Sequence, residues 1–236
     1  MKPLTLDTAD RLAKKFRADN GLSLKEAINL KSLLRKLKIL TLFSPLSNDF
    51  YGMSILSPNG LRFLLINSNN QKGRQHFTIA HELYHLFLDE NPRPHICRQA
   101  DGSKNISETQ ADLFASALLM PEEGLLDFIS KEEIINRTVH LATVIRMEQY
   151  YSVSRLALLI KLKSCKLITE ARLEELRVQV KDSAKQYGYD TSLYEPGNEG
   201  LIIGDFGEKA RLLFEKEIIS EGHYVGLLNL ITNAKD

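Results

Sequence analysis

One short stretch constrains this chain more than any other. Residues 77–90 read FTIAHELYHLFLDE, and His81, Glu82 and His85 within them form the pattern H-E-x-x-H. On a helix, residues four apart lie above one another on one face, so both imidazoles can reach a single metal ion. The flanking residues are apolar nearly all round, as in a buried helix, where imidazoles need partners. The pattern therefore predicts a zinc site on a buried helix.

Glu82 directly follows the first expected metal ligand. From this position a carboxylate can reach a water on the metal without binding the metal itself. It can then accept the proton of that water as the water attacks a peptide carbonyl. Glu82 is thus the predicted catalytic base, zinc (Zn²⁺) the predicted cofactor, and a zinc-dependent peptidase the predicted activity.

A catalytic zinc ion has three protein ligands and one open position, so the third ligand must come from elsewhere in the chain. Residues 108–120 (ETQADLFASALLM) favour a helix capped by Ser107, and Glu108 in its first turn is the chosen third ligand. Asp112, one turn further on, can accept a hydrogen bond from a metal-binding histidine. Asp89 competes with Glu108, but three ligands spaced four apart along one helix do not converge easily on one ion.

The composition is that of an ordinary soluble globular protein. Of 236 residues, 43% are hydrophobic and 26% are charged, and 31 Lys and Arg balance 30 Asp and Glu. This balance gives no general basic field for nucleic acid. The apolar runs are too short to span a membrane, the start of the chain lacks a signal-peptide core, and two cysteines indicate no disulfide framework. We expect a cytoplasmic protein.

The chain predicts an α+β fold in which a small antiparallel sheet packs with a zincin-like H-E-x-x-H helix core. Strands are expected over residues 38–43, 51–56 and 61–67, the last two joined as a hairpin by the turn signal at 57–60. Helices are expected over residues 7–20, 23–34, 77–90, 108–120, 130–150, 155–163, 168–186, 208–216 and 220–231.

A helix-turn-helix-like unit is expected near residues 138–163, where two helices flank a tight turn and the second helix carries basic residues. Direct DNA binding through this unit is disfavoured by the neutral total charge. Residues 1–165 are expected to form the main domain, which includes this unit. Residues 166–236 are expected to form a small, mainly helical C-terminal module without a chemical motif.

The segment after the motif helix offers two further reactive side chains, His95 and Cys97. Neither has ligand spacing to a second partner, so both are interpreted as ordinary loop residues. The group that would stabilise the oxyanion stays open between His95, Tyr84 and His140. For Tyr84, simple packing is the favoured interpretation.

The run RQHFTIAHELYHLFL, followed after a loop by ETQADLFASALLMP, resembles the ImmA/IrrE-type metallopeptidases of bacteria and phages. The resemblance covers roughly residues 8–165. It implies a zinc site of His81, His85 and Glu108 with Glu82 catalytic. It also implies a substrate, a partner helix-turn-helix repressor often encoded nearby, whose cleavage derepresses stress-response or mobile-element genes. Tyr84 departs from the family pattern, which usually has a small residue there.

A rival interpretation from another class stays open. The chain could be a DNA- or partner-binding regulator of a toxin–antitoxin or phage module that acts without proteolysis. A complex with its partner that forms without cleavage would favour this alternative.

Overall fold

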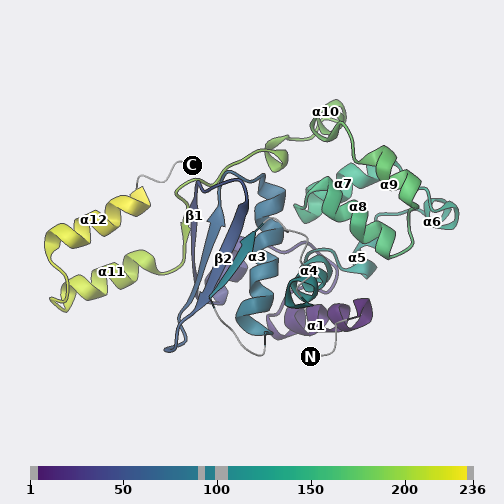
Figure 1. Cartoon of the computed structure of the whole chain (residues 1–236). Helices are drawn as coiled ribbons and strands as arrows, with labels where there is room; N and C mark the ends of the chain where they lie inside the picture. The colour runs from purple at the N-terminus through teal and green to yellow at the C-terminus, as the bar shows by residue number, and fades with distance from the viewer. Residues whose placement is uncertain (1–4, 90–93, 99–105, 233–236) are drawn as a thin grey trace.

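A five-stranded mixed sheet lies at the centre of the computed structural model, which describes residues 5–89, 94–98 and 106–232. Helix α3 covers one face of the sheet, α4 packs on α3, and α1 packs on α4 (Figure 1). The strands, in the spatial order β4-β2-β3-β1-β5, are β1 Ile39–Ser44, β2 Phe50–Leu56, β3 Arg62–Asn67, β4 His95–Arg98 and β5 Ile202–Ile203.

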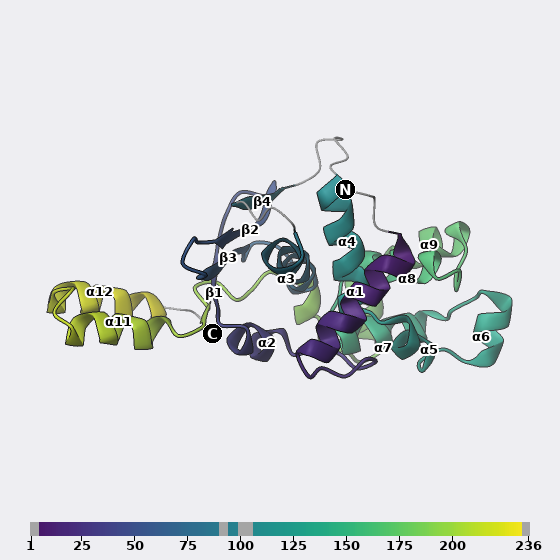
Figure 2. The same cartoon turned by 90° about the horizontal axis from the view of Figure 1, so that it is seen from below.

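The helices fall into three groups along the chain. The first group surrounds the sheet and comprises α1 Leu6–Asp19, α2 Leu30–Lys36, α3 Lys72–Phe87 and α4 Ile106–Leu119. The second forms a helical region beyond α4 (Figure 2), with α5 Glu122–Leu126, α6 Lys131–Asn136, α7 Leu141–Tyr151, α8 Arg155–Ser164, α9 Glu170–Leu176, α10 Val180–Gln186 and the short 3-10 helix η1 Ser192–Tyr194. The third is the pair α11 Phe206–Glu215 and α12 Glu221–Thr232.

The prediction of an antiparallel sheet is wrong for one strand. The hairpin of β2 and β3 is confirmed, but β1 runs parallel to β3, with Ile39 opposite Arg62 and Ser44 opposite Asn67. The chain leaving β1 must therefore pass beyond the end of β3 before it enters β2. β4 and β5, which were not predicted, pair antiparallel with β2 and β1 respectively.

The side chain of Asn67 organises this crossing. Its amide nitrogen donates to the carbonyls of Ser47 (2.8 Å) and Phe50 (2.7 Å), and its oxygen accepts from the amides of Leu46 and Asn69 (both 3.0 Å). Asn67 is fully buried, so these bonds replace the water that a crossing segment would otherwise need. Asn67 thus holds the connection that allows β1 to run parallel to β3, and no short sequence pattern predicts this role.

The helix predicted from Ser23 begins later, at Leu30, and that prediction is wrong in its first turns. The Ser23 hydroxyl does accept from the amide of Glu26, as a capping residue would. However, the buried guanidinium of Arg17 takes the carbonyls of Ser23 and Glu26, and it also binds the carbonyl of Leu118. Arg17 thus satisfies carbonyls of this segment, which stays irregular up to the start of α2.

Two long predicted helices are each broken in two by a residue in the left-handed conformation. The helix predicted over 130–150 stops at Arg137 (φ 50°) and restarts as α7, and that over 168–186 breaks at Gln179 (φ 50°). The capping box of Ser130 and Glu133 is confirmed. Glu133 also accepts from the amide of His140 (2.8 Å), so it caps one helix and opens the next.

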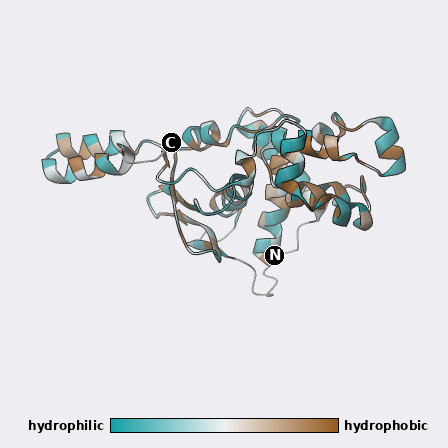
Figure 3. Cartoon of the chain, turned by 90° about the horizontal axis from the view of Figure 1, so that it is seen from above, coloured by the Kyte–Doolittle hydropathy of each residue, from teal (hydrophilic) through white to brown (hydrophobic). Residues whose placement is uncertain are grey.

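The segment after residue 165 contributes to the main core. Leu167, Leu173 and Ile203 belong to the same hydrophobic cluster as the sheet and α3, whereas α11 and α12 project away from the sheet and carry hydrophobic as well as hydrophilic residues (Figure 3). The domain boundary at 165/166 stays a prediction. No helix of the described residues is long and apolar enough to cross a membrane.

Asn67→Asp should destabilise the fold by about 2–4 kcal/mol, because a buried carboxylate oxygen would face two carbonyls that now accept hydrogen bonds. Urea unfolding measures the change. Asn59→Asp, in the exposed turn between β2 and β3, is the control and should change stability by less than about 0.5 kcal/mol. Equal stability of the two variants would refute the role of Asn67.

Glu133→Gln should lower stability by about 2–3 kcal/mol at pH 7. Burial opposes ionisation of Glu133, but hydrogen bonds from the His140 and Ser130 amides and the Thr143 hydroxyl outweigh it and lower its pKa to about 2. Since the folded-state pKa lies below the unfolded value, this stabilisation is present above about pH 4.5 and is lost as the pH falls toward 2.

Urea unfolding of both proteins between pH 7 and 3 tests this. The gap between wild type and Glu133→Gln should shrink below about pH 4.5. Glu132→Gln, at the exposed neighbouring position, should show no comparable gap at any pH. A gap that does not vary with pH would contradict the assignment.

Candidate metal centre

Helix α3 carries the H-E-x-x-H pattern through the middle of the molecule, between the sheet and α4. His81, Glu82 and His85 are 3%, 0% and 4% exposed, because the apolar residues around them face the core on every side. Buried ionisable groups are stable only when they are paired, so these three side chains need partners from other elements.

Glu108, from the first turn of α4, completes a triangle of donor atoms. His81 Nε2 lies 3.3 Å from His85 Nε2, and both face the Glu108 carboxylate, at 3.3 Å (Oε2) and 3.6 Å (Oε1). The packing of α3 on α4 therefore brings together the three residues that the sequence predicted as ligands.

These distances fit a tetrahedral ion. Two ligands placed about 2.05 Å from a tetrahedral zinc lie about 3.3 Å apart. Two imidazole nitrogens and one carboxylate oxygen are also a donor set that zinc takes in catalytic sites. The residues present thus fit a zinc ion with a further position for a water or a substrate.

Carboxylates hold the outer nitrogens of both histidines. Asp112 Oδ1 lies 2.9 Å from His81 Nδ1, which is the contact predicted from the sequence. Asp89 Oδ2 lies 3.2 Å from His85 Nδ1 and also accepts from the Ser107 hydroxyl (3.1 Å). Protons on Nδ1 leave both Nε2 atoms free for a metal. Asp89, the competing candidate for third ligand, therefore lies behind His85, on the side away from the Nε2 atoms.

Two side chains from neighbouring strands hold Glu82. The Ser54 hydroxyl in β2 donates to Glu82 Oε2 (2.5 Å), and His95 Nδ1 in β4 lies 3.0 Å from the same oxygen. Ser54 and His95 are opposite one another in the β2–β4 ladder. The ladder thus delivers both residues to one carboxylate.

His95 was interpreted as an ordinary loop residue, and that interpretation is wrong. Its Nε2 lies 2.7 Å from Glu108 Oε1, and its ring stacks on His85 with centroids 3.7 Å apart. Donor atoms of His81, His85, His95 and Glu108 all lie within 4.8 Å of one another. Cys97, two residues along β4, offers a sulfur atom within 4.8 Å of ligand atoms of His81 and Glu82. The only sequence signal is the spacing of two, which places both side chains on one face of a strand.

Carboxylates shift the pKa values of two histidines of the centre. Burial opposes protonation, yet hydrogen bonds to Asp112 and Glu108 raise the pKa of His81 to about 9. Despite burial, hydrogen bonds to Glu108 and Glu82 raise the pKa of His95 to about 10. The same histidines hold the pKa of Glu108 well below its usual range, against its own burial. The carboxylates and imidazoles of the centre thus stabilise one another's charged forms.

The other two candidates for oxyanion stabilisation lie differently. Tyr84 is 1% exposed and donates its hydroxyl to Gln110 (2.7 Å) in the core, while its ring packs against Phe114. This arrangement supports packing as the role of Tyr84. His140 is exposed at the start of α7, away from the cluster of donor atoms.

Comparison with known protein families gives one match. The model of peptidase family M78, described as the IrrE N-terminal-like domain, matches residues 34–163, more than half of the chain. No curated protein matches the sequence. The matched region contains α3, β4 and α4, and hence every donor atom of the centre. A buried H-E-x-x-H helix within such a match leaves one conclusion: the chain belongs to the ImmA/IrrE (M78) family of metallopeptidases.

Proposed function

We propose that this protein is a zinc-dependent endopeptidase with His81, His85 and Glu108 as metal ligands and Glu82 as the general base. The observation that carries the proposal is the triangle of donor atoms at tetrahedral spacing, in a chain of a peptidase family. A carboxylate oxygen of Glu82 lies within 4.8 Å of a ring nitrogen of His81. Glu82 is the only acidic residue of α3, and it is fully buried.

A bound zinc ion would polarise the scissile carbonyl and lower the pKa of water in the open position. The protein's own part is to place a base. Glu82 is fully buried, and the Ser54 hydroxyl and His95 ring fix the direction of its carboxylate. Held in this way, Glu82 accepts the proton of the attacking water and can return it to the leaving amine.

The sheet edge supports a peptide substrate. β4 is the outermost described strand on the side of the metal centre, and its first residue, His95, reaches the centre. An extended peptide that pairs with the outer edge of β4 would pass the metal centre. The family resemblance then suggests the substrate, a helix-turn-helix repressor encoded near this protein, whose cleavage would derepress stress-response or mobile-element genes.

The alternative, regulation through DNA or partner binding without proteolysis, has weaker support. The pair α7 and α8 does flank a turn at 152–154. However, Arg155 is buried in an ion pair with Glu148, Lys161 is 6% exposed, and Lys163 pairs with Glu170. Three of the four basic residues on which the DNA interpretation rested are thus engaged or enclosed, and the fourth, Lys166, is exposed.

Glu82→Gln should retain one zinc per chain and lose cleavage by at least about 100-fold, because the amide cannot accept the proton of the water. His85→Ala should lose both zinc and cleavage. Metal analysis by mass spectrometry and cleavage of the neighbouring helix-turn-helix protein measure the two effects. Cleavage at the normal rate by Glu82→Gln would refute the mechanism, and unchanged zinc in His85→Ala would refute the ligand assignment.

His95→Ala should keep zinc, because the three proposed ligands remain, and should slow cleavage by about 10–100-fold, because Glu82 and Glu108 lose a shared partner. His140→Ala, which removes an exposed histidine outside the centre, is the matched control. Loss of zinc from His95→Ala would instead make His95 a ligand and overturn its role as a positioning residue.

A further inference from the structure

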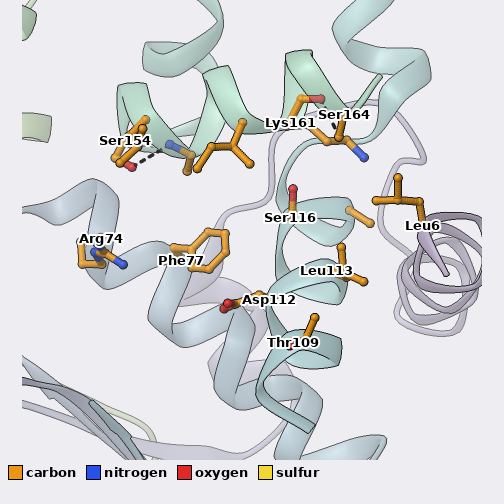
Figure 4. A pocket seen from close by; sticks show the side chains of 14 residues that line it. Leu6, Arg74, Phe77, Thr109, Asp112, Leu113, Ser116, Ser154, Lys161 and Ser164 are labelled. Carbon is orange, nitrogen blue, oxygen red and sulfur yellow. Dashed lines mark hydrogen bonds between the residues drawn. The ribbon is translucent and has the colours of Figure 1, made fainter. Parts of the chain in front are cut away.

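A cavity of about 310 Å³ lies between α1, α3, α4 and α8 and is open to solvent on one side (Figure 4). Its lining is mostly apolar, with Phe77 and Leu113 inside. Leu6, Leu156 and Ile160 also line it and are 49%, 47% and 51% exposed. Such a volume is at the lower end of the range for small-molecule sites, and an apolar lining with few polar groups is typical of them.

One charged residue of the lining is buried. Lys161 is 6% exposed, and its ammonium group forms no ion pair or hydrogen bond within the described part of the chain. Buried lysines are almost always paired. Its nitrogen still keeps accessible surface, since it is not among the fully enclosed atoms without a partner. The neighbouring Lys163, by contrast, points outward and pairs with Glu170.

The other charged groups of the lining, unlike Lys161, are exposed. Arg74 is exposed and stacks over the ring of Tyr51 (4.6 Å to the centroid). Asp112 holds His81, and Figure 4 shows it on the side of the cavity away from Lys161. Asp112 would repel an anion at that side. The charge distribution thus favours a negative head group at Lys161 and an apolar tail along Phe77 and Leu113.

We propose that this cavity binds a small amphipathic anion, with a carboxylate or phosphate head group at Lys161 and a short hydrocarbon tail in the apolar part. This site is separate from the metal centre and goes beyond the peptidase function. Ser116, whose hydroxyl lines the cavity between the two ends, adds a donor for the head group. The same cavity borders Asp112, so its ligand would lie against the residue that holds His81.

Isothermal titration calorimetry on the full chain tests the proposal with octanoate, octyl phosphate and octanol. At least one of the two anions should bind at a single site, at least tenfold more tightly than octanol. The tighter anion identifies the head group. Lys161→Met should weaken binding of that anion at least tenfold, while Lys161→Arg and the outward-facing control Lys163→Met should preserve it.

A second variant guards against a folding defect in Lys161→Met. Ser116→Phe fills the cavity and should abolish binding of the anion with the melting temperature nearly unchanged. Absence of saturable binding by both anions, or equal binding by wild type and Lys161→Met, would overturn the proposal. A loss confined to Arg74→Met would overturn the position of the head group.

Discussion

The fold is built around a concentration of buried charge between α3 and α4. Donor atoms of His81, His85, His95 and Glu108 lie within 4.8 Å of one another, and Glu82 contacts His95. His81, Glu82 and His85 are buried, and buried ionisable groups are stable only when they are paired. Here the carboxylates and imidazoles pair with one another. Helices α3 and α4 must therefore be held rigidly enough to keep His81 Nε2, His85 Nε2 and the Glu108 carboxylate close together.

That rigidity comes from regions well away from the metal centre. Gly73, in the first turn of α3, abuts the turn between α7 and α8, where an added Cβ would lie 2.7 Å from the backbone nitrogen of Ser154. At the other side, Arg17 joins α1 to the end of α4 through the carbonyl of Leu118. The turn between α7 and α8 thus packs directly against the start of the H-E-x-x-H helix.

The parts that the sequence predicted are those whose signal is local. Two such signals are the spacing of His81 and His85 and the capping box at Ser130. Each lies within one or two helical turns, so it can be recognised from a few neighbouring residues. His95 is different: it reaches Glu82 only because β4 pairs with β2 opposite Ser54, and no short pattern encodes that pairing. The parallel β1 strand likewise depends on tertiary bonds, those of Asn67.

The two-residue strand β5 covers one edge of the sheet. Ile202 and Ile203 cover the outer edge of β1, and Ile203 is 1% exposed. They come from well beyond the matched family region, yet they close an edge of the sheet on which the metal-binding helix packs. An open edge is a template for another chain to add a strand. In a chain trimmed to residues 34–163, this edge of β1 would lose its strand partner and be open to pairing with another chain.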